Sequence, residues 1–181
     1  MAAANLSLDT AFAETLYRSM LYDIVFDALP KMLAHLVGEG GFISVYNVIA
    51  EASKRVYSFI LEKMPEKPKS LREAAMLMKL MADIHNRFGD ATVGVPRIRV
   101  EIVSDHEAYI RCRGSGFKGN SEHRYVPVVF VGLVGGFLEA LGFHVKPLRS
   151  EDSVRFLQPG ELGVLAEGNS RECIVKIVSK A

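Results

Sequence analysis

The sequence predicts an α+β domain: N-terminal helices, then a twisted antiparallel sheet of about four strands with a central buried glycine-rich helix. Up to Gly89, apolar residues recur at the three- and four-residue spacing of amphipathic helices, whereas beyond it they alternate as in strands. The stretch Val128–Gly142 is apolar on nearly every side, as in a helix that is buried all round. Helices segregated to one face of an antiparallel sheet characterise the α+β class.

The composition limits the class of protein. A chain of 181 residues has the size of one domain, so we expect a single domain over residues 1–181. A formal net charge of +1 gives no reason to expect binding to nucleic acid or to an anionic membrane. The first residues lack the basic and apolar regions of a signal peptide, so we expect a cytoplasmic protein. The single glutamine is consistent with a thermophilic source, although seven methionines point the other way.

Two long helices are predicted before Pro65, and Pro30 separates the first of them from a short helical piece over Lys31–Val37. Asp9 or Thr10 begins the first, whose apolar stripe comprises Phe12, Leu16, Met20, Ile24 and Val25. The second is predicted over Ile43–Lys63, with an apolar side made of Val45, Val48, Ile49, Ala52, Val56, Phe59 and Ile60.

A third helix begins at a capping box formed by Ser70 and Glu73. Its predicted apolar stripe comprises Met76, Leu77, Leu80, Met81, Ile84 and Phe88. Methionines on such a stripe suit an adaptable ligand surface, but ordinary core packing is the favoured interpretation at helical spacing.

Strict alternation predicts two strands, Arg97–Val103 and Ala108–Arg113, joined by a hairpin turn at Ser104–Glu107. The inward side is predicted to contain Ile98, Val100, Ile102, Ala108, Ile110 and Cys112. The outward side then carries Arg97, Arg99, Glu101, Arg111 and Arg113.

The central helix carries Gly132 and Gly136, four residues apart, which clears a strip where another backbone can approach closely. A transmembrane pairing face is excluded because the apolar stretch is shorter than the roughly 20 residues that a spanning helix needs. Core packing is therefore expected, and the sequence leaves open whether the glycines leave a cavity. Beyond this helix, His144–Leu148 and Glu172–Val178 are predicted strands, and the structure of Ser150–Gly168 is left open.

A glycine motif and two cysteines are candidate functional residues. Gly114, Gly116 and Gly119 have the GxGxxG spacing of a dinucleotide site, but the preceding strand belongs to a hairpin, so a plain connection is favoured over an anion site. Cys112 and Cys173 fall on inward strand positions and are expected to be core thiols, since scattered cysteines and histidines are a weak signal for metal.

The most specific cluster contains Arg97, Arg99, Arg111 and Arg113, because same-face residues on adjacent antiparallel strands lie close together. We interpret it either as a solvated sheet face relieved by acidic neighbours or as a site for an anion or an acidic partner protein. No aromatic ladder for single-stranded nucleic acid accompanies it. Because no paired carboxylates, nucleophile elbow, P-loop or metal-binding helix is present, we expect a binding module and no enzyme, cofactor or metal.

The C-terminal motifs carry a family resemblance. The segments GLVGGFLEALG, HVKPL and EGNSRECIVKIV resemble the 4-vinyl-reductase domain family and equally the small subunits of the TRAPP vesicle-tethering complex, which share that fold. The matching positions are Gly132, Gly136, Leu138, Glu139, Gly168 and Cys173, and Tyr46 agrees with a tyrosine in the second helix. Zinc-binding members carry further cysteines where this chain has Val128–Val131 and Leu165, so the resemblance supports no zinc site.

The resemblance implies a homodimer formed through parts of Leu16–Phe26, and a sensing or scaffolding role. Our first hypothesis is a sensor-like domain that binds an apolar ligand between helices and sheet, near Tyr46, Cys112, Phe130, Val134 and Cys173. The second is an assembly subunit that binds a partner protein through the basic sheet face or through Ser150–Gly168. A vinyl-reductase-type enzyme ranks third, because no residue supplies a hydride source.

Overall fold

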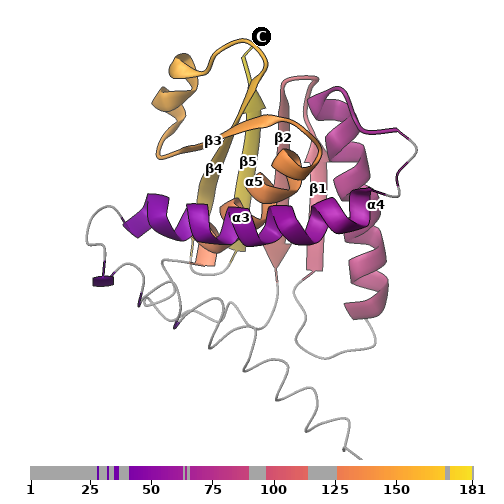
Figure 1. The fold of residues 1–181 in the computed structure, drawn as a ribbon, viewed down its shortest axis with the longest axis horizontal. Helices are drawn as coiled ribbons and strands as arrows, with labels where there is room; N and C mark the ends of the chain where they lie inside the picture. Colours follow the sequence, from indigo (N-terminus) through magenta and orange to yellow (C-terminus); the bar gives the residue numbers. More distant parts are fainter. Residues whose placement is uncertain are drawn as a thin grey trace, which may run out of the picture.

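A computed structural model describes residues 41–62, 64, 66–89, 97–113, 126–169 and 172–180, together with positions 28, 32, 35 and 36. The predicted first helix, its association segment Leu16–Phe26 and the glycine loop at 114–119 lie outside the described residues. The fold is α+β, as predicted (Figure 1). Its elements are α3 (Gly41–Leu61), α4 (Leu71–Gly89), β1 (Arg97–Ile102), β2 (Glu107–Arg113), α5 (Val126–Ala140), β3 (His144–Leu148), η4 (Glu151–Phe156), β4 (Glu161–Asn169) and β5 (Glu172–Ser179).

The sheet differs from the prediction in strand number and direction. It has five strands in the order β1-β2-β5-β4-β3, and β3 pairs with β4 in parallel, so the expectation of about four antiparallel strands was wrong in these two respects. The additional strand, β4, falls within Ser150–Gly168 except for its last residue, Asn169. Its residues Leu162–Leu165 are all buried, because an apolar cluster covers the outer face of the sheet. The cluster comprises Leu148, Leu157, Leu165 and Val178, and Val154 of the 3₁₀ helix η4 packs against it. A strand buried on both faces shows no alternation, so the sequence pattern did not reveal it.

The hairpin of β1 and β2 pairs its inward residues with one another. Ile98 lies opposite Cys112, Val100 opposite Ile110, and Ile102 opposite Ala108. The inward side chains of this hairpin belong to the main core, as predicted.

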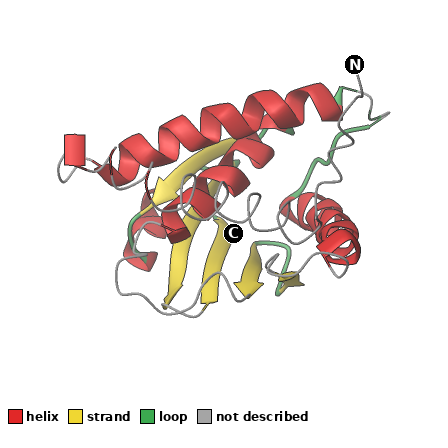
Figure 2. Ribbon diagram, turned by 90° about the horizontal axis from the view of Figure 1, so that it is seen from below, coloured by secondary structure: helices red, strands yellow, loops and turns green. Residues whose placement is uncertain are grey.

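The layers of the domain follow from α5, which lies between α3 and the sheet (Figures 1 and 2). The glycines of α5 lack side chains, so the backbone of α3 packs directly against the backbone of α5. A Cβ at Gly136 would lie 2.2 Å from the Ala50 carbonyl oxygen, and one at Gly132 would lie 2.8 Å from the Ile49 Cβ. The Ser53 hydroxyl donates to the Leu133 carbonyl at 2.8 Å across the same contact. The glycine strip therefore permits tight helix packing, and it encloses no cavity on this side of α5.

The apolar faces predicted for α3 and α4 were wrong in part. On α3, Val45 and Ile49 are buried, but Val56 and Phe59 are 59% and 70% exposed. On α4, Met76, Leu80 and Ile84 of the predicted stripe are exposed, whereas Leu77 and Met81 pack against the core. The helix also buries residues outside that stripe, namely Leu71, Ala74, Ala75, Met78 and Ala82. Both helices are apolar on more than one side, so spacing alone does not select the face that packs. The small side chains decide it, since they let α4 approach the sheet closely.

The predicted capping box of α4 is half formed. The Glu73 N–H donates to the Ser70 Oγ at 3.2 Å, as the motif requires. The Glu73 carboxylate accepts from the Lys69 N–H, one residue earlier than the motif expects.

Candidate functional site

An apolar cavity lies between α4 and α5. Helix α4 packs on β1 and β2, whereas α5 packs on β3, β4 and β5, so the two helices cover different parts of the sheet. The space between them is a cavity of about 220 Å³. Its walls are Tyr57 from α3, Met78, Met81, Ala82 and His85 from α4, Ile98, Val100, Ile110 and Cys112 from the hairpin, and Phe130, Leu133, Val134 and Phe137 from α5.

The cavity walls favour a neutral ligand. Among the described residues of the lining, Tyr57 and His85 alone bring a polar side chain to it. The Tyr57 ring stands edge-on to Phe137, with ring centroids 4.9 Å apart, and burial raises the pKa of the Tyr57 phenol, which keeps it uncharged. An apolar cavity of about 150 Å³ is known to stay dry and to bind benzene. The present cavity is therefore large enough for an apolar molecule somewhat bigger than a single aromatic ring.

The structure brings three of the five predicted ligand residues to this cavity and leaves two outside it. Cys112, Phe130 and Val134 are in its wall, whereas Tyr46 and Cys173 are not. The Tyr46 ring packs against Gly135, on the side of α5 that faces α3. Its buried hydroxyl has no hydrogen-bond partner among the described residues, and burial, followed by the charge of Glu139, raises the pKa of the Tyr46 phenol.

The two cysteines form a cross-strand pair. Cys112 on β2 lies directly opposite Cys173 on β5, and both are free and buried. Hydrogen bonding with Cys112, together with burial, raises the pKa of the Cys173 thiol. The Cys173 thiol is therefore neutral and packs as a small apolar side chain, while Cys112 contributes to the cavity wall.

Sequence reasoning missed the contribution of α4 to the cavity. Met78, Met81 and His85 recur at three- and four-residue spacing on one side of that helix, and all three line the cavity. The methionines on α4 carried this signal, although core packing was the favoured interpretation.

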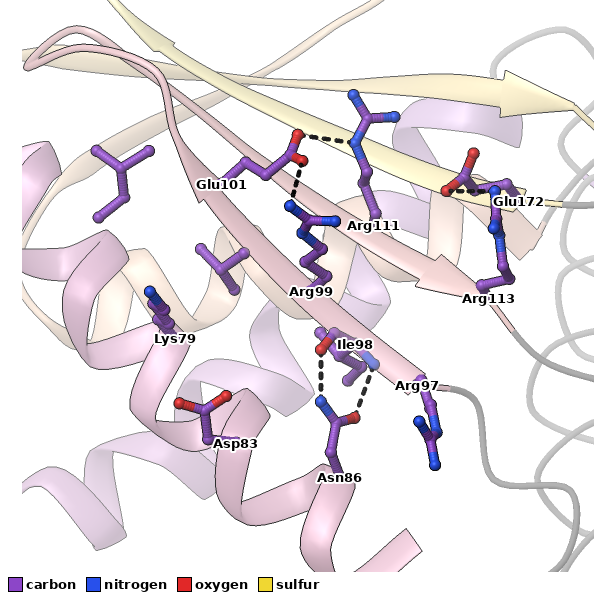
Figure 3. A pocket seen from close by; sticks show the side chains of 12 residues that line it. Lys79, Asp83, Asn86, Arg97, Ile98, Arg99, Glu101, Arg111, Arg113 and Glu172 are labelled. Carbon is purple, nitrogen blue, oxygen red and sulfur yellow. Dashed lines mark hydrogen bonds and ion pairs between the residues drawn. The ribbon is translucent and has the colours of Figure 1, made fainter. Parts of the chain in front are cut away.

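The predicted basic cluster lies on the outer face of the sheet and is largely paired (Figure 3). Glu101 accepts from Arg111 at 3.0 Å and contacts Arg99 at 3.4 Å, and Arg113 lies 3.7 Å from Glu172. The hydrogen bond from Arg111, then the charges of Arg111 and Arg99, lower the pKa of the Glu101 carboxyl.

A polar groove of about 900 Å³ runs beside this cluster. Five basic side chains line it, namely Lys79, Arg97, Arg99, Arg111 and Arg113. Three acidic ones, Asp83, Glu101 and Glu172, oppose them, which leaves an excess of two positive charges. We call this feature the basic groove. It suits an acidic partner better than a basic one.

Within the part of the chain that the structure describes, no three or more His, Cys, Asp or Glu side chains gather as a metal site would require. None of the described helices is long and apolar enough to cross a membrane.

Comparison with known proteins adds little. No protein-family model matches the chain, and no curated protein matches it. Among solved structures, the chain is similar to several H-NOX proteins. One of them was studied for the mechanism of H-NOX activation; it has a TM-score of 0.45 and 13% sequence identity, and the match covers 82% of this chain and 68% of that chain. Another was studied for heme distortion in the H-NOX family (TM-score 0.47, 12% identity, 82% and 66% of the two chains). A third is a point mutant of T. tengcongensis H-NOX (TM-score 0.46, 12% identity, 82% and 68%). These values are too low to transfer a ligand or a residue's role.

Proposed function

We propose that this domain binds a small, neutral, apolar molecule in the cavity between α4, α5 and the β1–β2 hairpin, and acts as a non-enzymatic, sensor-like module. The observation that supports this most strongly is the cavity itself, which measures about 220 Å³ and is walled almost wholly by apolar side chains. Pockets that combine apolar walls with a few polar groups are the usual sites for small molecules.

The apolar walls favour occupation by an apolar molecule. Each Å² of apolar surface that a ligand and these walls remove from water contributes about 25 cal/mol. Because side chains from three helices and two strands form the walls, the cavity cannot collapse without moving several elements of the fold.

Calorimetry with indole as the probe tests this proposal. Ala82 lines the cavity, so Ala82→Leu fills part of it and is expected to weaken indole binding by at least about tenfold. Ala52→Leu adds the same side-chain volume on the exposed side of α3 and is expected to leave binding unchanged. If wild-type protein binds no indole, or if both variants bind it as wild type does, the cavity is not a binding site.

We also propose that the chain is a domain of the 4-vinyl-reductase or TRAPP small-subunit type and that it forms a homodimer. The motif around Gly132 and Gly136 supports the family, and the exposed apolar residues Val56 and Phe59 support association, because large exposed apolar groups mark interaction surfaces. Light scattering is expected to give twice the chain mass of 20.0 kDa. A monomer at all accessible concentrations would contradict the proposal.

A second candidate function is the binding of a partner protein at the basic groove. Its excess positive charge favours this role. The double variant Arg99→Glu and Arg113→Glu is expected to abolish binding of a poly-glutamate peptide. The double variant Arg55→Glu and Arg155→Glu, at exposed positions outside the groove, is the charge-matched control and is expected to retain it. Equal binding by the two proteins would remove the groove from consideration.

A further inference from the structure

Strand β1 forms an edge of the sheet. It pairs with β2 on one side, and among the described residues no strand lies on its other side. The hydrogen bond from the Val103 N–H to the Glu107 carbonyl shows that odd-numbered residues of β1 point their backbone groups toward β2. The even-numbered residues Ile98, Val100 and Ile102 therefore direct their N–H and C=O groups away from the sheet.

The backbone N–H and C=O of Ile98 are already hydrogen-bonded, as they would be to a neighbouring strand. The Asn86 side chain of α4 accepts from the Ile98 N–H at 2.9 Å and donates to the Ile98 carbonyl at 2.7 Å. This pair confirms the outward direction of the even-numbered residues. Val100 and Ile102, further along the edge, receive no such contact from the described residues.

The basic groove lies beside this unpaired part of the edge. One of its walls is β1 with Ile98, Val100 and Ile102, and the other is α4 with Lys79, Asp83 and Asn86 (Figure 3). A groove between an edge strand and a helix is the arrangement in which an extended peptide adds to a sheet, with backbone hydrogen bonds for affinity and side-chain contacts for specificity.

We propose that an acidic, extended segment of a partner protein adds to β1 as a sixth strand, in the groove between β1 and α4. The inference rests on the second candidate function and names its partner class. Backbone groups of Val100 and Ile102 pair with the segment, and Asn86 closes the groove at the Ile98 end. Side chains of the segment on the outer face lie beside Arg97 and Arg99, where acidic groups complement the excess positive charge.

Hydrogen exchange followed by NMR tests the strand addition directly. The probe is an acetylated peptide of alternating glutamate and valine, about eight residues long, which matches the usual length of a strand. We expect it to slow exchange of the Val100 and Ile102 amides by at least about tenfold, because these N–H groups then donate to the peptide. The Arg99 and Glu101 amides already donate within the β1–β2 hairpin and are expected to change little.

Two pairs of variants separate backbone pairing from charge attraction. Ile102→Pro removes one edge N–H without touching the β1–β2 ladder and is expected to weaken peptide binding about tenfold, whereas Ile102→Val keeps the N–H and is expected to bind as wild type. Thermal unfolding verifies that both variants are folded. A lysine–valine peptide of equal length is expected not to bind.

The outcomes distinguish the two proposals. Binding of the glutamate–valine peptide without protection of Val100 and Ile102, or unaffected by Ile102→Pro, would overturn strand addition and leave the basic groove as a protein site. Failure of the peptide to bind at all would overturn both. Equal binding of the lysine–valine peptide would overturn the acidic character of the partner.

Discussion

The Asn86 side chain of α4 makes both edge hydrogen bonds of Ile98 on β1, accepting at 2.9 Å and donating at 2.7 Å. It fixes the position of α4 against the edge of the sheet. Since α4 is also a wall of the apolar cavity and of the basic groove, this pair stabilises the frame of both sites.

Loss of the Asn86 amide is expected to destabilise the domain. In Asn86→Ala, the half-buried N–H and C=O of Ile98 lose their partners, so the free energy of unfolding falls by about 1–3 kcal/mol. Urea unfolding measures the change. Arg87→Ala, at an exposed position on the same helix, is the control and is expected to change stability by less than about 0.5 kcal/mol. Equal effects of the two substitutions would show that the pair does not stabilise the fold.

The close contact between α3 and α5 predicts that Gly→Ala substitutions on α5 lower the stability of the domain by different amounts. Gly136→Ala places a Cβ against the backbone oxygen of Ala50, which cannot move independently, so we expect a loss of about 1–3 kcal/mol despite better helix propensity. Gly132→Ala meets the Ile49 side chain and is expected to cost less. Thermal unfolding of the two variants provides the test, and the reverse order would contradict the observed packing.

Removal of the Tyr46 hydroxyl is expected to stabilise the domain. The group is buried without a hydrogen-bond partner among the described residues, and such a group costs about 1–3 kcal/mol. Tyr46→Phe is therefore expected to raise the free energy of unfolding by about 1 kcal/mol, measured by urea unfolding. A loss of stability would indicate that the hydroxyl has a partner.

The pair of Glu101 and Arg111 predicts a pH dependence. The folded state lowers the pKa of Glu101, so the ionised carboxylate stabilises the fold above its unfolded pKa of about 4.3. This stabilisation is lost as the pH falls through the lower, folded value. The difference in stability between wild type and Glu101→Gln is therefore expected to be present at neutral pH and to vanish in strong acid. A difference that stays constant over this range would contradict the assignment.

Elements with one buried face and one solvated face could be predicted from the sequence, because their apolar and polar residues alternate regularly. The alternation of Arg97–Val103 predicted the strand and the faces of its side chains, because one side of β1 is solvated. The spacing of Gly132 and Gly136 predicted the close approach of another backbone, although not that α3 supplies it.

The remaining features depend on tertiary packing that no local pattern records. Strand β4 was not predicted because Leu148 and Leu157 cover its outer face, which removes the alternation. The faces of α3 and α4 were misassigned because both helices are apolar on several sides. The cavity lies between α4 and α5, so the residues that line it come from elements that are distant in sequence. Tyr46 was expected in the cavity between helices and sheet, but it lies between α3 and α5.

The most direct test of ligand binding is native mass spectrometry of the protein purified from its own host, under conditions that retain bound molecules. If the cavity of about 220 Å³ binds an apolar molecule, we expect each chain to carry excess mass that disappears on denaturation. The same excess mass is expected to be absent from Ala82→Leu and retained by Ala52→Leu. A mass equal to that of the bare chain in wild type, with no response to indole, would contradict ligand binding.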